Sequence, residues 1–359
     1  MKAQVKQIDF TGQNIYAGFD VHKNSWKVTV MAEDIVYKTF TQPPKPEILY
    51  NFLKNNFPGG TYHSAYEAGF FGYWIHDKLV SFGIKSMVVN PADIPTTDKE
   101  RVQKEDKRDS RKIARSLSSG TLTPIYVPSI QTQRDRSLMR TRSMLVKDLT
   151  RYKNRIKGFL HFYGICLDDA FAKPQSHWTN RFMRWLESID LDGASGKEAL
   201  QILISECKNL RVSILKVTRQ IRELSQTATY QEQVTLLKSV PGIGLITAMT
   251  ILTELETIDR FNNLDKMCGY IGLVPSTKSS GEKERTGDIT PRGHSVLRSA
   301  IIESSWMAIK YDPSLMKSYL IYCKRMDSNK AIVKIAKKLL NRIRFVLANK
   351  KPYKCLIEK

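Results

Sequence analysis

The stretch Ile15-Tyr-Ala-Gly-Phe-Asp20 is a short apolar run that ends in a carboxylate. Such a run predicts a buried strand. Similar β-forming runs predict further strands at residues 26–31, 35–40, 62–67 and 84–90. Helical patterns lie between the later strands, at 46–57 and 73–82. This order predicts an α/β domain in which helices cover a mixed sheet.

The remainder of the sequence has a helical pattern. Strand signals vanish over 131–230, where two long patterns rich in Arg and Lys cover 134–163 and 208–228. They fit an antiparallel helical pair used for dimerisation or spacing, and equally fit helices with a solvated basic face. The last region is helical with glycine-rich turns and ends in a basic helix at 331–347. We expect three domains, at residues 1–130, 131–230 and 231–359.

The charge of the chain is unusual for a globular protein. It has 57 Lys and Arg against 35 Asp and Glu, a net charge of +22, which indicates a nucleic-acid partner. The five cysteines contain no Cys-x-x-Cys pair, so the sequence favours neither a zinc knuckle nor a disulfide framework. Without a long apolar stretch for a signal peptide or a membrane span, we expect a cytoplasmic protein with no membrane partner.

Four carboxylates occur in an order that suits a metal site. Asp20 and Glu67 end two predicted strands, and Asp106 and Asp109 are three positions apart near a predicted helix start. That spacing puts the last two on one helical face. Carboxylate oxygens are the ligands that Mg²⁺ prefers, and two such ions assist phosphoryl transfer. Taken singly, each residue is also explained as a turn residue or a helix cap.

Three acidic motifs resemble those of a known family: Ala-Gly-Phe-Asp20-Val-His-Lys, Tyr-Glu67-Ala-Gly and Lys-Glu-Asp106-Lys-Arg-Asp109. They look like the motifs of the DEDD transposases of the insertion sequence 110 family, which include the Piv-type DNA invertases. The resemblance spans residues 13–165. It implies an RNase H fold similar to the junction resolvase RuvC, with the four carboxylates as catalytic ligands of Mg²⁺, or of Mn²⁺ in its place.

A glycine-rich turn, Pro241-Gly242-Ile-Gly244, lies between two helical patterns. Such a turn exposes backbone N–H groups at a helix N-terminus, where a phosphate can bind. It resembles the turn of helix-hairpin-helix DNA-binding modules. A plain glycine-rich turn without a ligand is the alternative. We therefore expect Gly242 and Gly244 to bind nucleic acid.

The segment 270–298 holds two serines, several glycines and a group of basic residues. A serine beside a glycine could attack a phosphodiester, with nearby cations stabilising the phosphate. The alternative is a polar loop that binds phosphate without chemistry. The cations that we expect to bind nucleic acid here are Lys283, Arg285, Arg292 and Arg298.

This segment also resembles the second domain of the same transposase family. The matching features are a Gly-Leu-x-Pro turn, Ser-Gly-x-Lys, Gly-x-Ile-Thr-x-x-Gly and a closing Leu-Arg, and the resemblance spans 234–345. The family's covalent nucleophile is the serine before the glycine, which implies Ser280, with Ser279 as the competitor. Pro291 and His294 stand where many relatives have Lys and Asn or Asp, so neither is included in the catalytic set.

The resemblance implies a transposase or site-specific recombinase of a mobile element, at work on the bacterial nucleoid. Its partners would be double-stranded donor and target DNA, a non-coding bridge RNA and further copies of the chain, as a dimer or tetramer. The alternative is a RuvC-like, metal-dependent junction endonuclease that uses water as nucleophile. A nucleic-acid-binding protein without catalysis is a third possibility; its activity would survive loss of metal.

Overall fold

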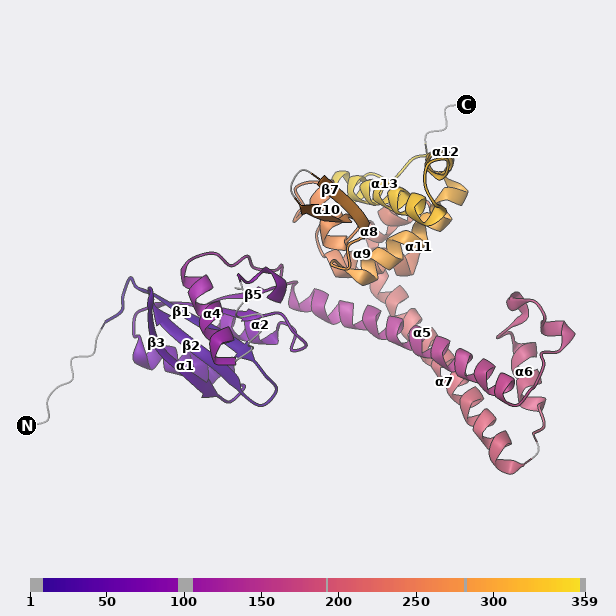
Figure 1. The fold of residues 1–359 in the computed structure, drawn as a ribbon, viewed down its shortest axis with the longest axis horizontal. Coiled ribbons are helices and arrows are strands. Elements are labelled where there is room, and N and C mark those ends of the chain that lie inside the picture. The colour runs from indigo at the N-terminus through magenta and orange to yellow at the C-terminus, as the bar shows by residue number, and fades with distance from the viewer. Residues whose placement is uncertain (1–8, 96–105, 192, 281–282, 356–359) are drawn as a thin grey trace, which may run out of the picture. The chain divides into compact units, whose positions relative to one another are not determined.

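The computed structural model describes residues 9–95, 106–191, 193–280 and 283–355 (Figure 1). The chain divides into two compact units, Met1–Val127 and Pro128–Lys359. The first unit is a mixed α/β structure, and the second is mostly helical. Among the described residues, no helix combines the length and apolarity needed to cross a membrane.

The first unit is built on a five-stranded sheet with the order β3-β2-β1-β4-β5. Neighbouring strands β1, β2 and β3 are antiparallel, whereas β4 is parallel to β1 and β5 is parallel to β4. All five predicted strands are confirmed, with bounds that differ by one or two residues. These are β1 (Asn14–Val21), β2 (Trp26–Ala32), β3 (Ile35–Gln42), β4 (Thr61–Glu67) and β5 (Lys85–Val89).

Helices cover both faces of this sheet because side chains alternate between its faces. On one face, Ile15 and Phe19 of β1 are fully buried in a cluster with α1 (Pro46–Asn56) and α2 (Trp74–Ser81). On the other face, Ala65 of β4 packs with Ile113 and Leu117 of α4 (Asp106–Ser118). Burying each large aliphatic side chain stabilises the fold by about 2 kcal/mol. A short 3₁₀ helix, η1 (Pro91–Asp93), follows β5.

The second unit begins with a long antiparallel helical pair, α5 (Ile130–Phe162) and α7 (Ala194–Ser225). Both predicted helical patterns are confirmed, although α7 begins well before the predicted residue 208. At one end of the pair, Leu160 of α5 and Ile204 of α7 share an apolar cluster with Phe182 of α6 (Asn180–Ser188). Two 3₁₀ turns precede α6, η2 (Asp169–Phe171) and η3 (Pro174–Ser176).

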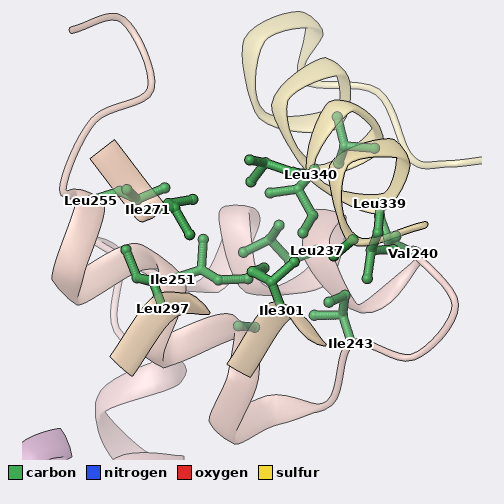
Figure 2. Close-up of a cluster of buried hydrophobic side chains, with 14 of the residues drawn as sticks. Leu237, Val240, Ile243, Ile251, Leu255, Ile271, Leu297, Ile301, Leu339 and Leu340 are labelled. Atoms are coloured by element: carbon green, nitrogen blue, oxygen red, sulfur yellow. The ribbon is translucent and has the colours of Figure 1, made fainter. Parts of the chain in front are cut away.

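The main core of the second unit is formed by the helices that follow (Figure 2). Its buried residues come from every one of these helices, for example Leu237, Ile251, Leu297 and Leu339. The helices are α8 (Gln231–Lys238), α9 (Leu245–Leu255), α10 (Leu264–Ile271), α11 (Ser295–Tyr311), α12 (Pro313–Cys323) and α13 (Ser328–Asn349). The predicted final basic helix is confirmed as α13.

A two-stranded hairpin interrupts this helical unit. Its strands are β6 (Pro275–Ser280) and β7 (Lys283–Ile289). The sequence did not predict these strands, because their side chains are mostly polar or charged and show no apolar alternation. Among its described side chains, the hairpin contributes no member to the buried apolar cluster of the unit.

Candidate functional site

Asp20 and Glu67 lie on the same face of the sheet. Asp20 is the penultimate residue of β1 and Glu67 is the last residue of β4. In the parallel pairing of these strands, Gly18 is opposite Ala65, so positions 20 and 67 follow on the same side at neighbouring strand ends. Both side chains are partly exposed. The structure therefore brings these two predicted site residues to one edge of the sheet.

Helix α4, which carries the other two carboxylates, covers this same face. A Cβ atom on Gly18 would lie 2.2 Å from the backbone N of Ala114, so helix and strand are in direct backbone contact there. The Ser110 hydroxyl is also 3.0 Å from that of Thr29 on β2. Asp109 directly precedes Ser110 and is partly exposed. The absence of a side chain at Gly18 thus sets how closely this helix approaches the sheet.

Among the described residues, no three His, Cys, Asp or Glu side chains come close enough to hold a metal ion. Asp106 is the first residue of α4, and its side chain lies outside the described residues. The Asp20 carboxylate is 2.9 Å from Nε2 of His22, a neighbour that the sequence did not single out. Asp20, Glu67 and Asp109 all offer carboxylate oxygen, and this donor set fits Mg²⁺.

Ser280 lies at the end of β6, where the ladder pairs it with Lys283. Ser279 is paired with Glu284 one step closer to the base of the hairpin. The side chains of Ser279, Ser280, Lys283 and Arg285 lie outside the described residues. The predicted nucleophile and two of its predicted cations therefore belong to one hairpin; residues 281–282, between its strands, are outside the described part.

The remaining two predicted cations, Arg292 and Arg298, lie beyond the hairpin. Arg292 is exposed. One guanidinium nitrogen of Arg298, Nη1, donates to the Thr290 carbonyl at 2.6 Å and lies 3.4 Å from the Gly272 and Arg292 carbonyls. This arginine therefore holds the base of the hairpin, a role that the sequence did not predict. The binding of nucleic acid by Arg298 stays a prediction; it would use the guanidinium N–H groups on Nε and Nη2.

The glycine turn joins α8 to α9, which confirms the predicted helix–turn–helix arrangement. Gly242 has φ +85°, and a Cβ there would lie 2.3 Å from the Ser304 carbonyl oxygen of α11. Gly244 is exposed, precedes α9 and has open space around it. Gly242 is thus required by packing, whereas Gly244 leaves the start of α9 accessible. Phosphate binding by the two residues stays a prediction.

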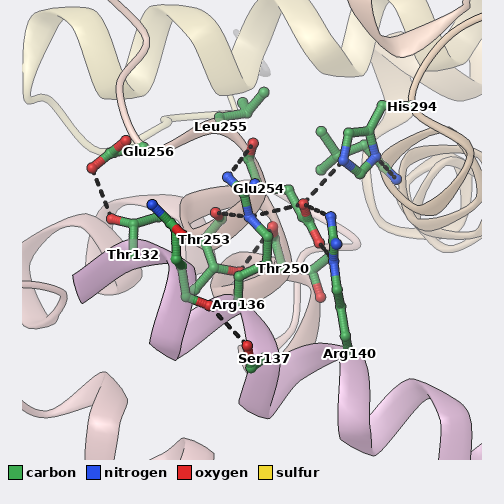
Figure 3. A network of polar contacts seen from close by, with 12 residues as sticks. Thr132, Arg136, Ser137, Arg140, Thr250, Thr253, Glu254, Leu255, Glu256 and His294 are labelled. Carbon is green, nitrogen blue, oxygen red and sulfur yellow. Dashed lines mark hydrogen bonds and ion pairs between the residues drawn. The ribbon is translucent and has the colours of Figure 1, made fainter. Parts of the chain in front are cut away.

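A buried carboxylate that the sequence did not single out, Glu254, lies at the end of α9. It contacts Arg136, Arg140 and His294, and Figure 3 shows these side chains converging on it. Its partners on α5 precede it by more than 100 positions. The only local signal is a single charged residue inside an otherwise uncharged helix, Leu245–Leu255.

Two family models match the chain; the first begins in the first unit and extends into α5, and the second lies within the second unit. A model for the DEDD transposase of IS110 elements matches residues 17–165. A second model, described as Transposase IS116/IS110/IS902 family, matches residues 234–320. The first match contains the four predicted metal-site carboxylates, and the second contains the glycine turn and the serine hairpin.

Several curated proteins are similar over most of the chain. The protein y4qE of Sinorhizobium fredii is 29% identical over 74% of this chain, and the match spans 63% of y4qE. The transposase for insertion sequence element IS1111A of Coxiella burnetii is 26% identical over 79% of this chain and 76% of its own length. The transposase for insertion sequence element IS1533 of Leptospira borgpetersenii is 24% identical over 70% of this chain and 72% of its own length. The family matches and these relatives agree, and the chain belongs to the IS110 family of insertion-element transposases.

Proposed function

We propose that this protein is an enzyme that cuts and rejoins DNA for a mobile insertion element, by way of a covalent link between Ser280 and a DNA phosphate. The observation that carries the proposal is the pairing of two unlike units in one chain. One bears strand-end carboxylates under α4, and the other bears a serine in a hairpin with Lys283 and Arg285. Hydrolysis of DNA by water would need only the first.

The chemistry consists of two exchanges at phosphorus. In the first, the Ser280 oxygen forms a bond to the phosphorus of a DNA strand, and the bond from that phosphorus to one sugar oxygen breaks. The serine proton passes to a base, and the leaving sugar oxygen takes up a proton. In the second, the hydroxyl of another strand end attacks the phosphoserine and releases the serine. Each step replaces one phosphate ester by another, so joining needs no external energy source.

The first unit would assist this chemistry through its carboxylates. Asp20, Glu67, Asp106 and Asp109 would hold Mg²⁺, or Mn²⁺ in its place, and a bound ion supplies positive charge that stabilises a phosphate during transfer. The strand order β3-β2-β1-β4-β5, with the first three strands antiparallel and β4 and β5 parallel to β1, supports an RNase H-like assignment for this unit. In such sheets, carboxylates at neighbouring strand ends come together.

Positive charge near the hairpin supports DNA as the substrate. A cavity of about 760 Å³ lies between the base of the hairpin and α13. Val274 and Ile289 line its hairpin side, and lysines spaced along one helical face line the other, at Lys330, Lys334 and Lys337. Lysines in such a row can neutralise phosphates along a nucleic-acid strand.

We further propose that the protein acts as a dimer or tetramer and takes its donor and target sites from a bridge RNA of the element. The exposed basic residues of α5 and α13 support an RNA partner, because structured RNA is recognised largely through its shape and backbone charge. Exposed apolar residues on the helical pair, Met144, Val212 and Leu215, support contact with a second copy.

A direct test is a search for a protein–DNA adduct that survives denaturing detergent. Purified protein would be incubated with Mg²⁺, donor and target DNA and the transcript that flanks the element. We expect an adduct from wild type and Ser279→Ala, and none from Ser280→Ala or Asp20→Ala. Mg²⁺-dependent nicking that persists in Ser280→Ala, without any adduct, would instead assign the protein as a RuvC-like endonuclease that uses water.

A further inference from the structure

Glu254, in the last turn of α9, is the centre of a buried polar network (Figure 3). Its side chain is 1% exposed. Arg140 donates to both carboxylate oxygens, from Nε to Oε1 and from Nη2 to Oε2, each at 2.9 Å. Arg136 Nε lies 3.1 Å from Oε2 and also donates to the Thr253 carbonyl at 3.0 Å. Because both arginines belong to α5, Glu254 joins that helix to α9.

The third partner of Glu254 is His294, which precedes α11. Its Nε2 lies 3.0 Å from Oε2 of Glu254, and its Nδ1 lies 3.3 Å from the backbone N of Leu297. A backbone N–H can only donate, so Nδ1 accepts and Nε2 carries the proton that is donated to Glu254. Glu254 therefore sets the tautomer and the ring orientation with which His294 caps the N-terminus of α11.

The charge of Glu254 is maintained by its partners. Burial alone would raise the pKa of this carboxyl group, but hydrogen bonds from His294 and Arg140 and the charges of Arg140 and Arg136 outweigh burial and lower the pKa to about 2. The group is thus ionised at neutral pH and takes no part in proton transfer there. A buried ion pair adds little net stability, and holding one specific geometry is its best-attested use.

His294 follows directly on the base of the serine hairpin. Thr290 donates its backbone N–H to the Val274 carbonyl at 3.0 Å, which closes the hairpin. A Cβ atom on Gly293 would lie 2.6 Å from Cα of Gly272, so the segments that precede β6 and follow β7 are in direct backbone contact. His294 itself donates its backbone N–H to α10 at 2.9 Å. A shift of the His294 ring would therefore move the base of the hairpin and, with it, β7, the strand that pairs with the Ser280 strand.

We propose that Glu254 is a positioning residue: through His294 it fixes the base of the hairpin that carries Ser280, and so the line along which the serine approaches phosphate. The inference rests on the serine chemistry proposed above. Glu254 itself is too deeply buried to contact DNA directly. Its loss would misplace the nucleophile and lower the rate of attack far more than the DNA affinity, because cations outside the hairpin, such as Arg292 and the lysines of α13, would still bind DNA.

The test uses His294→Asn in the full-length protein. Asn is among the best N-cap residues, so this variant keeps the cap of α11 while its shorter side chain removes the link to Glu254. We expect the single-turnover rate of adduct formation at saturating DNA to fall on the order of 100-fold, with a much smaller change in DNA affinity. Hydrogen exchange of the backbone amides over 290–297 should become faster. Glu254→Gln should lower the rate in the same way.

Asp312→Asn is the matched control. Asp312 is also a fully buried carboxylate that pairs with an arginine, Arg342, and caps a helix, α12; among the described residues, no contact links it to the hairpin. We expect it to lose stability and to keep the wild-type rate per folded molecule. Wild-type rates in His294→Asn and Glu254→Gln would overturn the inference and leave the proposed function standing. An equal loss of rate in Asp312→Asn would also overturn it, and no adduct from wild type would overturn both proposals.

Discussion

Replacing Gly18 by Ala should force α4 away from β1. The added Cβ would lie 2.2 Å from the backbone N of Ala114, 2.6 Å from its Cα and 2.7 Å from the Ser110 carbonyl oxygen. Ordinary van der Waals contact begins at 3.4 Å, so the helix or the strand has to shift by about 1 Å. All three atoms are backbone, and no flexible side chain can move instead. Overpacking of this kind costs about 1–3 kcal/mol.

The same shift should reduce activity. Asp109 belongs to α4 and Asp20 follows Gly18 on β1, so separating the two elements separates the carboxylates proposed to hold Mg²⁺. A displacement near 1 Å lowers the rate of a positioned reaction on the order of 100-fold. Gly18→Ala should therefore lose adduct formation to that extent and need a higher Mg²⁺ concentration.

Two measurements are needed. One is the rate of adduct formation as a function of Mg²⁺ concentration, and the other is unfolding in urea, monitored by hydrogen exchange in peptides from β1. Gly69→Ala is the control, because a Cβ at Gly69 meets no atom within 4 Å and the glycine has no positive φ. The control should match wild type in stability. Wild-type stability and wild-type Mg²⁺ dependence in Gly18→Ala would refute the claim that close contact of α4 and β1 sets the geometry of the carboxylates.

Three further changes test the second unit. Asp312→Asn should lower the free energy of unfolding by about 3 kcal/mol in urea titrations, because it leaves Arg342 without its buried partner; a loss near zero would contradict the pairing. Gly242 has φ +85°, and a Cβ there would lie 2.3 Å from a carbonyl oxygen of α11, so Gly242→Ala should lower the free energy of unfolding by about 2 kcal/mol. Gly244→Ala should lower it much less, because the space around Gly244 is open. Equal losses in the two variants would argue against the close packing at Gly242. The pKa of Glu254 is depressed from 4.5 to about 2, so its contribution, on the order of 3 kcal/mol, is complete above the unfolded pKa and is lost as pH falls from about 5 to 2. Unfolding measured across that range should be flatter in Glu254→Gln than in wild type.

The sequence was sufficient to predict elements whose apolar pattern reports their own burial. The run Ile15 to Asp20 and the four other strand patterns are confirmed as one sheet, since alternation along a strand is a local signal of a face buried by helices. The long basic patterns are confirmed as α5 and α7, because apolar residues recurring at helical spacing are also a local signal of a buried face. The carboxylates and Ser280 were identified by residue type and motif, and their catalytic roles stay predictions.

The hairpin β6–β7 was not predictable in this way. Its strands are defined by pairing with each other, Ser279 with Glu284 and Ser280 with Lys283, and no apolar face marks them in the sequence. Likewise, nothing local to Arg298 indicated that its guanidinium would hold three backbone carbonyls at the base of this hairpin. Such contacts depend on where the neighbouring elements lie.

What the sequence determined by itself is therefore periodic or compositional: the strands, the long helices, the positive charge and the order of the carboxylates. What only the tertiary structure decided are contacts between distant segments. In the sequence, nothing distinguishes Gly18 from other strand residues, and only the fold shows that α4 packs directly against it. Glu254 is the one charge in helix α9, and only the fold brings Arg140, 114 positions earlier, and His294, 40 positions later, into contact with it. Periodicity records which face is buried, whereas a partner so far along the chain is determined only when the whole chain packs.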